Sequence, residues 1–168
     1  SLGCYGHPQV KTPNIDQLAS TGTRFEQCIS SVPITLPSHA TMLTGSQPFV
    51  HGARDNGQFI VGEKNVSIAE ILRDAGYTTH AEVGGAVLDR EYGLDQGFET
   101  YGDLKLRTAG AQIAADTDIV DEDESRPQDD SLWSKFDRKA DAITHDGLAL
   151  LDQYRDKQFF IFLHYYDP

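Results

Sequence analysis

A hydroxyl side chain stands just ahead of a proline that can open a helix, in the segment Thr35-Leu36-Pro37-Ser38-His39. Proline suits the first turn of a helix, where free N–H groups and the positive dipole end attract anions. Ser38 and His39 fall in that turn, within reach of the same anion. The pattern indicates a site for an anionic ester and the charge that builds up on it. The structural alternative is an ordinary loop-to-helix start with Thr35 as a local cap.

Other polar residues are weaker candidates. Arg54 and Asn56 lie in the turn-rich segment 48–57 and are predicted to bind substrate, although turn residues with local hydrogen bonds would look the same. His80 is interpreted as a surface residue at a strand end. Eight carboxylates and one arginine between Asp116 and Asp130 indicate a solvated, mobile loop within about 110–130, because they lack the spacing of a metal loop.

Helices and strands alternate along the chain. Helices are predicted at about 12–22, 37–43, 66–75 (capped by Ser67) and 132–155, and strands at 23–30, 77–83 and 159–165. The last strand is expected to be internal and the stripe from Trp133 to Tyr154 to belong to the core. Alternation of this kind predicts an α/β three-layer sandwich with a largely parallel central sheet.

Composition excludes several classes of protein. The 168 residues carry a net charge of −12, which argues against a nucleic-acid partner. No apolar run approaches the roughly 18–20 residues that cross a bilayer, so no membrane segment is expected. Cys4 and Cys28 show no metal-ligand spacing and are predicted to be small core residues.

Six segments, in order, resemble the sulfatase branch of the alkaline phosphatase superfamily, and together they span nearly the whole chain. They are Leu2–Gly6, Thr12–Ala19, Thr35–Gly45 with His51-Gly52, Leu72–Thr78, Gly93–Phe98 and Phe162–Pro168. The resemblance implies an incomplete alkaline phosphatase-like catalytic domain over residues 1–168. The Thr-x-Pro-x-His pattern also resembles the nucleophile loop of nucleotide pyrophosphatase/phosphodiesterases.

In sulfatases the signature is Cys or Ser-x-Pro-Ser-Arg, and its first residue is oxidised to formylglycine. The resemblance places Thr35 at the nucleophile, with Ser38 and His39 as its supporting residues. Formylglycine is not expected, because the Cβ of threonine already carries a methyl group. The Gly-Lys-Trp-His segment that contacts sulfate in many sulfatases has only Gly84-Gly85 here. These departures favour phosphoryl or phosphonyl esters.

The resemblance also implies a divalent cation, with calcium preferred over magnesium, manganese or zinc. Of its family ligands only Thr35 stands in this chain, so we expect no tight metal binding by these residues alone. His164 and Asp167 resemble a strand-end segment that approaches the site, and His164 is a candidate substrate-binding residue.

The sequence therefore predicts part of a metal-dependent hydrolase of sulfate, phosphate or phosphonate esters. The chain shows no initiator methionine or signal-peptide pattern, and we expect an inactive fragment of a larger enzyme. The alternative is a non-catalytic module that binds an anionic glycan or lipid head group. The oligomeric state is left open, and a bacterial parent would be periplasmic or at the cell envelope.

Overall fold

The computed structural model describes residues 2–103 and 138–166. The chain divides into two compact units, Ser1–Ser30 and Ser31–Pro168, and each is considered by itself. The acidic segment at 110–130 and the first six residues of the helix predicted at 132–155 lie outside the described residues. The helices are α1 (Pro13–Thr21), α2 (Thr35–Thr44), α3 (Pro48–His51), α4 (Ile68–Asp74) and α6 (Ala140–Tyr154), with short 3-10 turns η1 (Gly3–Tyr5), η2 (Ala86–Leu88) and η3 (Arg90–Tyr92).

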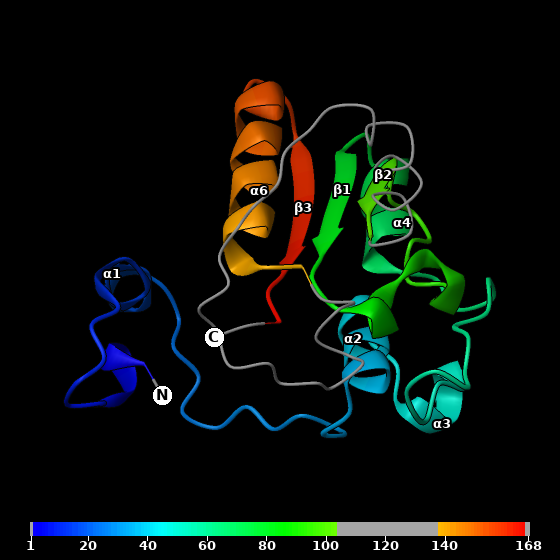
Figure 1. Cartoon of the computed structure of the whole chain (residues 1–168), viewed down its shortest axis with the longest axis horizontal. Coiled ribbons are helices and arrows are strands. Elements are labelled where there is room, and N and C mark those ends of the chain that lie inside the picture. Colours follow the sequence, from blue (N-terminus) through cyan, green and yellow to red (C-terminus); the bar gives the residue numbers. More distant parts are fainter. Residues whose placement is uncertain (1, 104–137, 167–168) are drawn as a thin grey trace, which may run out of the picture. The chain divides into compact units, whose positions relative to one another are not determined.

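Three parallel strands form the sheet of the larger unit, in the order β2-β1-β3 (Figure 1). The strands are β1 (Thr78–Val83), β2 (Thr100–Gly102) and β3 (Phe159–His164). Thr78 lies opposite Phe159 and Val83 lies opposite His164. The carboxyl ends of β1 and β3 therefore meet at one edge of the sheet, which is where ligands bind in open α/β sheets.

Helices cover both faces of this sheet. On one face, His80 of β1 stacks on Tyr154 of α6, with the ring centroids 4.2 Å apart. On the other, Ala81 of β1 is buried in one cluster with Ala40 of α2. Successive side chains of a strand point to opposite faces, so β1 is buried between two layers of helix. This arrangement confirms the predicted α/β class with a parallel sheet.

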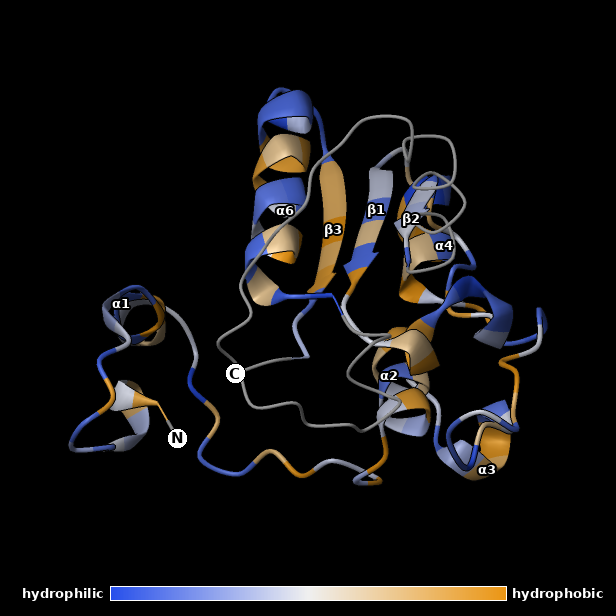
Figure 2. Cartoon of the chain, viewed as in Figure 1, coloured by the Kyte–Doolittle hydropathy of each residue, from blue (hydrophilic) through white to orange (hydrophobic). Residues whose placement is uncertain are grey.

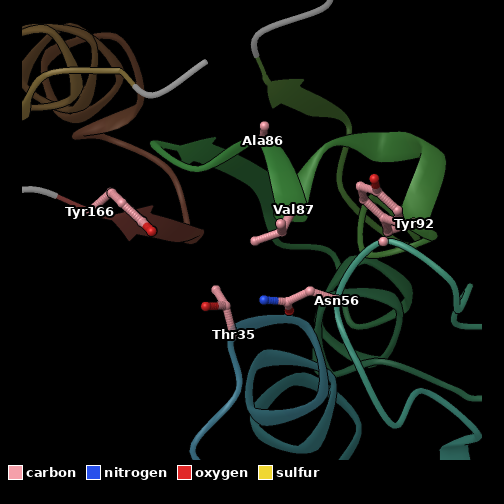
Figure 3. A pocket seen from close by; sticks show the side chains of 7 residues that line it. Thr35, Asn56, Ala86, Val87, Tyr92 and Tyr166 are labelled. Carbon is pink, nitrogen blue, oxygen red and sulfur yellow. The ribbon is translucent and has the colours of Figure 1, made fainter. Parts of the chain in front are cut away.

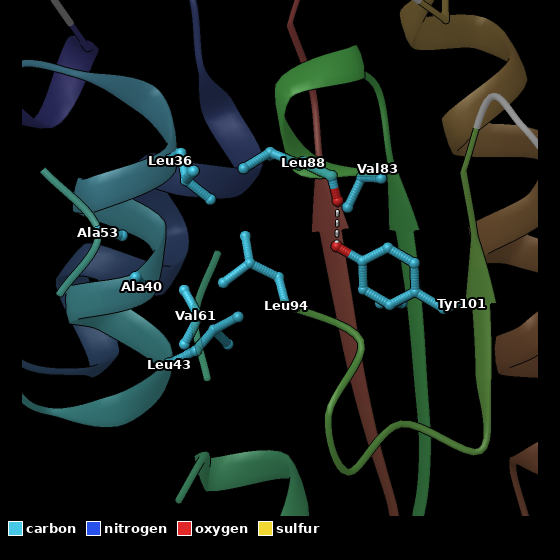
Figure 4. Packing of buried hydrophobic residues seen from close by; sticks show 10 residues of the cluster. Leu36, Ala40, Leu43, Ala53, Val61, Val83, Leu88, Leu94 and Tyr101 are labelled. Atoms are coloured by element: carbon cyan, nitrogen blue, oxygen red, sulfur yellow. Dashed lines mark hydrogen bonds between the residues drawn. The ribbon is translucent and has the colours of Figure 1, made fainter. Parts of the chain in front are cut away.

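The core on the α2 face holds the start of α2 against the sheet edge. It consists of apolar side chains of α2, β1 and the segments that follow each of them, namely Leu36, Ala40, Leu43, Ala53, Val61, Ala81, Val83, Leu88, Leu94 and Tyr101 (Figure 4). The Tyr101 hydroxyl donates to the Leu88 carbonyl over 2.7 Å, which satisfies the one polar atom that this ring brings into the core.

Local signals account well for α4. The Ser67 hydroxyl accepts from the Glu70 N–H over 3.1 Å, and the Glu70 carboxylate accepts from the Ser67 N–H over 2.8 Å. This reciprocal pair is a capping box, and it satisfies two of the N–H groups that a helix start leaves free. The predicted cap at Ser67 is confirmed.

The helix α6 is amphipathic, with apolar and polar bands along its length (Figure 2). Ile143 is fully buried, and a Cβ at Gly147 would lie 2.7 Å from the Leu163 side chain, so α6 packs closely on β3. Leu148 and Leu151 are 61% and 41% exposed. The prediction that this whole stripe belongs to the core is therefore wrong at these two leucines, which are largely exposed.

Two strand predictions need correction. β3 is apolar along most of its length (Figure 2), yet all its residues are only half-buried, because β3 is an edge strand of the described sheet rather than an internal one. Residues 23–30, predicted as a strand, are exposed and form no strand. Their alternation is only partial, so the strand pattern is weak from the outset.

His80 is also not the surface residue that its polar character suggested. It is 1% exposed, and its Nδ1 lies 2.6 Å from the Thr100 hydroxyl. Its Nε2 is buried and has no hydrogen-bond partner in the described structure. Burial between β1 and α6 lowers the pKa of His80, while Glu99 raises it and Lys157 lowers it further.

Arg138 links the carboxyl end of β1 to α6. Its guanidinium is 2.5 Å from a Glu82 oxygen and 2.5 Å from an Asp146 oxygen, and its backbone N–H donates to the Gly84 carbonyl over 2.8 Å. The Arg138 side chain is 3% exposed. The buried guanidinium holds Glu82 and Asp146 in place. Removal of any one of the three side chains would leave an uncompensated buried charge.

In the smaller unit, Asp16 ties α1 to η1. Its carboxylate accepts from the Cys4 N–H over 2.7 Å and from the Thr12 hydroxyl over 2.9 Å. Leu18 of α1 is 71% exposed. Cys4 is half-buried and Cys28 is exposed, so the prediction that both cysteines are core residues is wrong for Cys28. Across the described part of the chain, no helix is long and apolar enough to cross a membrane.

Candidate active site

The helix α2 begins at Thr35 itself. Ile34 occupies the cap position with extended backbone angles and makes no side-chain cap bond. Thr35 is therefore the first helical residue, not the cap that the structural alternative required. Its place puts the side chain of Thr35 at the positive dipole end of the helix.

Asn56 supplies the missing cap from a distant turn. Its Oδ1 accepts from the Leu36 N–H over 2.9 Å. Because a backbone N–H can only donate, this bond assigns the amide oxygen to α2 and leaves the Nδ2 group free to point elsewhere. The amide nitrogen turns toward Thr35 (Figure 3).

Ser38 and His39 both bind the Thr35 carbonyl. The Ser38 hydroxyl donates to it over 2.9 Å, and His39 Nδ1 lies 2.7 Å from it. A carbonyl only accepts, so His39 carries its proton on Nδ1 and leaves Nε2 as the bare nitrogen. These two side chains hold the backbone of Thr35 rather than its hydroxyl.

His164 packs against His39 from the end of β3. The two rings meet edge to face with centroids 4.7 Å apart, and the ring centroid of Phe162 is 6.1 Å from that of His39. Burial lowers the pKa of His39, against the opposing effect of its bond to the Thr35 carbonyl. Burial and the neighbouring His39 lower the pKa of His164 to about 4. Both imidazoles are therefore neutral at neutral pH.

A cavity of about 340 Å³ opens beside Thr35 (Figure 3). Its lining residues come from α2, the turn after α3, the turns after β1 and the segment after β3, and they are Thr35, Asn56, Gly57, Ala86, Val87, Tyr92 and Tyr166. Of the residues predicted for the site, Thr35 and Asn56 line this cavity. Ser38, His39 and His164 lie near Thr35 without lining it, and Arg54 is exposed outside it.

Sequence reasoning missed the wall formed by Ala86, Val87, Tyr92 and Tyr166. The signal that points to it is Gly84-Gly85, directly after the buried strand β1. A Cβ at Gly84 would lie 3.0 Å from the His164 carbonyl oxygen, and a Cβ at Gly85 would lie 3.2 Å from the Tyr166 ring. The glycine pair lets the segment after β3 pass close to the end of β1.

The described residues do not make a metal centre by themselves. Within residues 2–103 and 138–166, no group of three or more His, Cys, Asp or Glu side chains is arranged to hold an ion. Thr35 offers one hard oxygen, which suits calcium or magnesium, but a divalent cation takes about six or more ligands. The donor set in this part of the chain therefore does not fit the cation that the sequence implied.

The family model named Sulfatase matches residues 1–168, and the chain belongs to that family. Human arylsulfatase A is 40% identical over an alignment of 84 residues that covers 46% of this chain and 16% of that protein. The N-acetylglucosamine-6-O-sulfatase of Bacteroides thetaiotaomicron is 34% identical over 104 residues, covering 62% of this chain and 18% of its own length. The chain thus spans less than a fifth of these two relatives.

Solved structures share the fold. One, in complex with its substrate D-glucosamine-2-N,6-O-disulfate, is 26% identical with a TM-score of 0.67 and covers 98% of this chain and 31% of its own. The phosphonate monoester hydrolase of Agrobacterium radiobacter is 22% identical with a TM-score of 0.69 and covers 99% of this chain and 38% of its own. At that identity the second likeness concerns the fold alone.

Proposed function

We propose that the protein carrying this chain hydrolyses sulfate or phosphate and phosphonate esters, with Thr35 as the nucleophile. The observation that supports this most directly is the position of Thr35. It is the first residue of a helix and lines a cavity together with an amide donor, Asn56. The family membership supports an ester of a strong oxyacid as the substrate.

The chemistry follows from the groups around that position. The Thr35 hydroxyl gives up its proton to water and its oxygen attacks phosphorus or sulfur. A bond from Thr35 Oγ1 to that atom forms, the ester bond breaks, and the leaving oxygen takes up a proton from water to depart as the alcohol. Water then releases the acid and restores threonine. Negative charge grows on the outer oxygens during attack, and the positive dipole end of α2 together with the Asn56 Nδ2 group would stabilise that charge.

Threonine favours phosphorus in this proposal. Formylglycine gives sulfatases a second hydroxyl that expels sulfate without attack at sulfur, and a threonine side chain cannot become an aldehyde. A plain hydroxyl is instead suited to a phosphoryl or phosphonyl intermediate that water opens. We therefore infer that phosphate diesters and phosphonate monoesters are better substrates than sulfate esters.

His39, Ser38 and His164 act as positioning residues. Ser38 and His39 bind the Thr35 carbonyl, and His164 holds the His39 ring edge to face. The neutral state of both imidazoles keeps the Nδ1–H bond to Thr35 intact without adding charge. Arg54 is proposed to meet substrate only through a part of it that extends beyond the cavity, since Arg54 lies outside the cavity lining.

A divalent cation, calcium or a similar hard ion, is proposed as the resident cofactor of the whole protein. When bound, it would lower the pKa of the attacking hydroxyl. Thr35 is the one ligand proposed from this chain. We propose that the remaining ligands lie outside the described residues.

The test compares Thr35→Val with Thr35→Ser in the longest natural protein that contains this chain. Valine keeps the shape of threonine but removes the hydroxyl, whereas serine keeps the hydroxyl. We expect kcat on a p-nitrophenyl phosphonate or phosphate diester to fall by about a thousandfold or more in Thr35→Val. Thr35→Ser should retain measurable activity.

Parallel assays with a p-nitrophenyl sulfate, with and without a chelator, give the preferred oxyacid and the cation dependence. Retention of wild-type activity by Thr35→Val would exclude threonine as the nucleophile. Anion binding without any hydrolysis in the unmodified protein would favour the alternative, a non-catalytic binding module.

A further inference from the structure

We infer that the cavity beside Thr35 takes an uncharged, apolar or aromatic arm of the ester, and that Tyr166 and Val87 determine this preference. The inference rests on the proposed function, because it assumes that the charged head of the ester lies at Thr35. It adds the chemical class of the organic part, which neither the family nor the names of the relatives define for this chain.

Thr35 and Asn56 lie on one side of the cavity, while Ala86, Val87 and Tyr92 lie across from them (Figure 3). Tyr166 closes a third side, and its hydroxyl points toward the cavity (Figure 3). None of the seven described lining residues has a charged side chain. An ester whose head is held at Thr35 and Asn56 therefore directs its organic arm toward aliphatic and aromatic carbon.

Size and solvation both favour a ring or a short alkyl chain. A volume of about 340 Å³ is near the lower end of ordinary ligand pockets. An additional sulfate or carboxylate on the arm would lose water against Val87 and the tyrosine rings without gaining a charged partner there. Burial of an unpaired charge costs free energy, whereas burial of apolar surface is favourable.

The Tyr166 wall depends on the glycine pair after β1. Gly85 has extended backbone angles that any residue adopts, so its lack of a side chain has another reason. A Cβ there would lie 3.2 Å from Cδ2 of Tyr166 and 3.6 Å from the His164 ring. Gly85 leaves the space in which the Tyr166 ring stands, so Gly85→Ala should displace that ring with little effect elsewhere.

The neighbouring tyrosine offers a matched control. Tyr165 and Tyr166 are 44% and 53% exposed, so truncation of either should leave the fold intact. Tyr165 does not line the cavity, and its hydroxyl instead accepts from the Thr144 hydroxyl over 3.2 Å. If loss of an exposed ring after β3 has a general effect on the protein, that effect should appear in both Tyr165→Ala and Tyr166→Ala.

The experiment measures binding of three stable probes, phenylphosphonate, methylphosphonate and inorganic phosphate, by calorimetry. It uses the longest natural protein that contains this chain, with its cation. We expect phenylphosphonate to bind about tenfold or more tightly than methylphosphonate, because only the phenyl ring fills the cavity. Tyr166→Ala and Gly85→Ala should each reduce this ratio severalfold, and Tyr165→Ala should not.

Two outcomes would overturn the inference alone. One is equal affinity for the two phosphonates while phosphate binds and Thr35-dependent hydrolysis is present. The other is a ratio that survives both Tyr166→Ala and Gly85→Ala. If no probe binds and hydrolysis does not depend on Thr35, the proposed function itself fails and the inference fails with it. Affinity for inorganic phosphate serves as the internal reference in every variant.

Discussion

Asn56 performs two tasks with the two ends of one amide. Its oxygen caps α2 through the Leu36 N–H, and its nitrogen faces the cavity that Thr35 lines (Figure 3). The first task stabilises the helix start, and the second offers a donor to an anion. The two tasks are separable because an aspartate at this place keeps an acceptor oxygen but has no N–H group.

Asn56→Ala and Asn56→Asp should therefore differ. Asn56→Ala is expected to lower the free energy of unfolding by about 1 kcal/mol, since it removes a helix cap. Asn56→Asp should keep most of that stability while weakening phosphate binding by about tenfold or more, because a donor becomes a negative charge. Urea titrations and calorimetry measure the two effects. Equal phosphate binding by wild type and Asn56→Asp would contradict the donor role.

His80 makes stability depend on pH. Burial lowers its pKa from the ordinary 6.5, and among the described residues Nε2 has no hydrogen-bond partner that would stabilise a proton there. The unfolded chain therefore binds this proton more readily than the folded chain. Stability is full above about pH 6.5 and is lost as the pH falls from there toward the lower pKa of the folded state.

We expect the free energy of unfolding to fall between pH 7.5 and 5, and to fall less in His80→Phe than in wild type. The fluorescence-monitored urea midpoint at several pH values measures this. His145→Gln is the control, since its side chain is 84% exposed. His39, His51 and His164 also have lowered pKa values, so part of the slope should remain in His80→Phe. An unchanged slope would show that His80 accepts its proton in the folded state.

At the scale of elements, the site depends on how closely the ends of β1 and β3 approach. Gly84 and Gly85 differ in what surrounds them. A Cβ at Gly84 would meet the His164 carbonyl oxygen at 3.0 Å and the Tyr166 nitrogen at 3.3 Å, which are backbone atoms that cannot turn aside. The Cβ at Gly85 would meet only side chains. A side chain at position 84 should therefore disturb the fold, whereas a side chain at position 85 should change the cavity.

Gly84→Ala is expected to cost about 1–3 kcal/mol of unfolding free energy, because it pushes two backbone segments apart. Gly85→Ala should cost less than about 1 kcal/mol, since the Tyr166 ring can move toward solvent. Chemical denaturation of both variants side by side measures the difference. Equal losses of unfolding free energy in the two variants would mean that the segment after β3 is not packed tightly against the end of β1.

At the scale of the whole molecule, the site is distributed over parts of the chain that are far apart in sequence. Thr35, Asn56, Val87 and Tyr166 come together only because α2, the β1 end and the β3 end meet at one sheet edge. Thr35 is the single ligand that we propose for the cation among the described residues. We therefore predict that cation binding requires further ligands from the longer natural protein.

Calorimetric titration of residues 1–168 with calcium should show no binding in the micromolar range, because one hydroxyl cannot replace the six to eight oxygens that calcium takes. The longer natural protein should bind in that range and lose affinity in Thr35→Val. Micromolar binding by residues 1–168 that disappears in Thr35→Val would refute this prediction.

Local sequence determined much of this protein. The alternation of helix and strand patterns predicted the α/β class, Ser67 predicted the start of α4, and the order of the family segments led to the sulfatase family and to Thr35. These signals are readable because caps, turns and strand runs depend on residues near one another in the chain. Turn chemistry indicated Asn56 as a candidate residue of the site, and the family resemblance indicated His164.

Only the tertiary structure decided the rest. In the tertiary structure Asn56 caps α2, His164 packs against His39, His80 is buried and residues 23–30 form no strand. The fold also assembled the cavity wall, whose Val87 and Tyr166 carry no motif. Burial and contact between distant segments depend on which faces meet, and spacing along the chain does not encode that. Thr35 was identified by its sequence, but its position at an apolar cavity came from the fold.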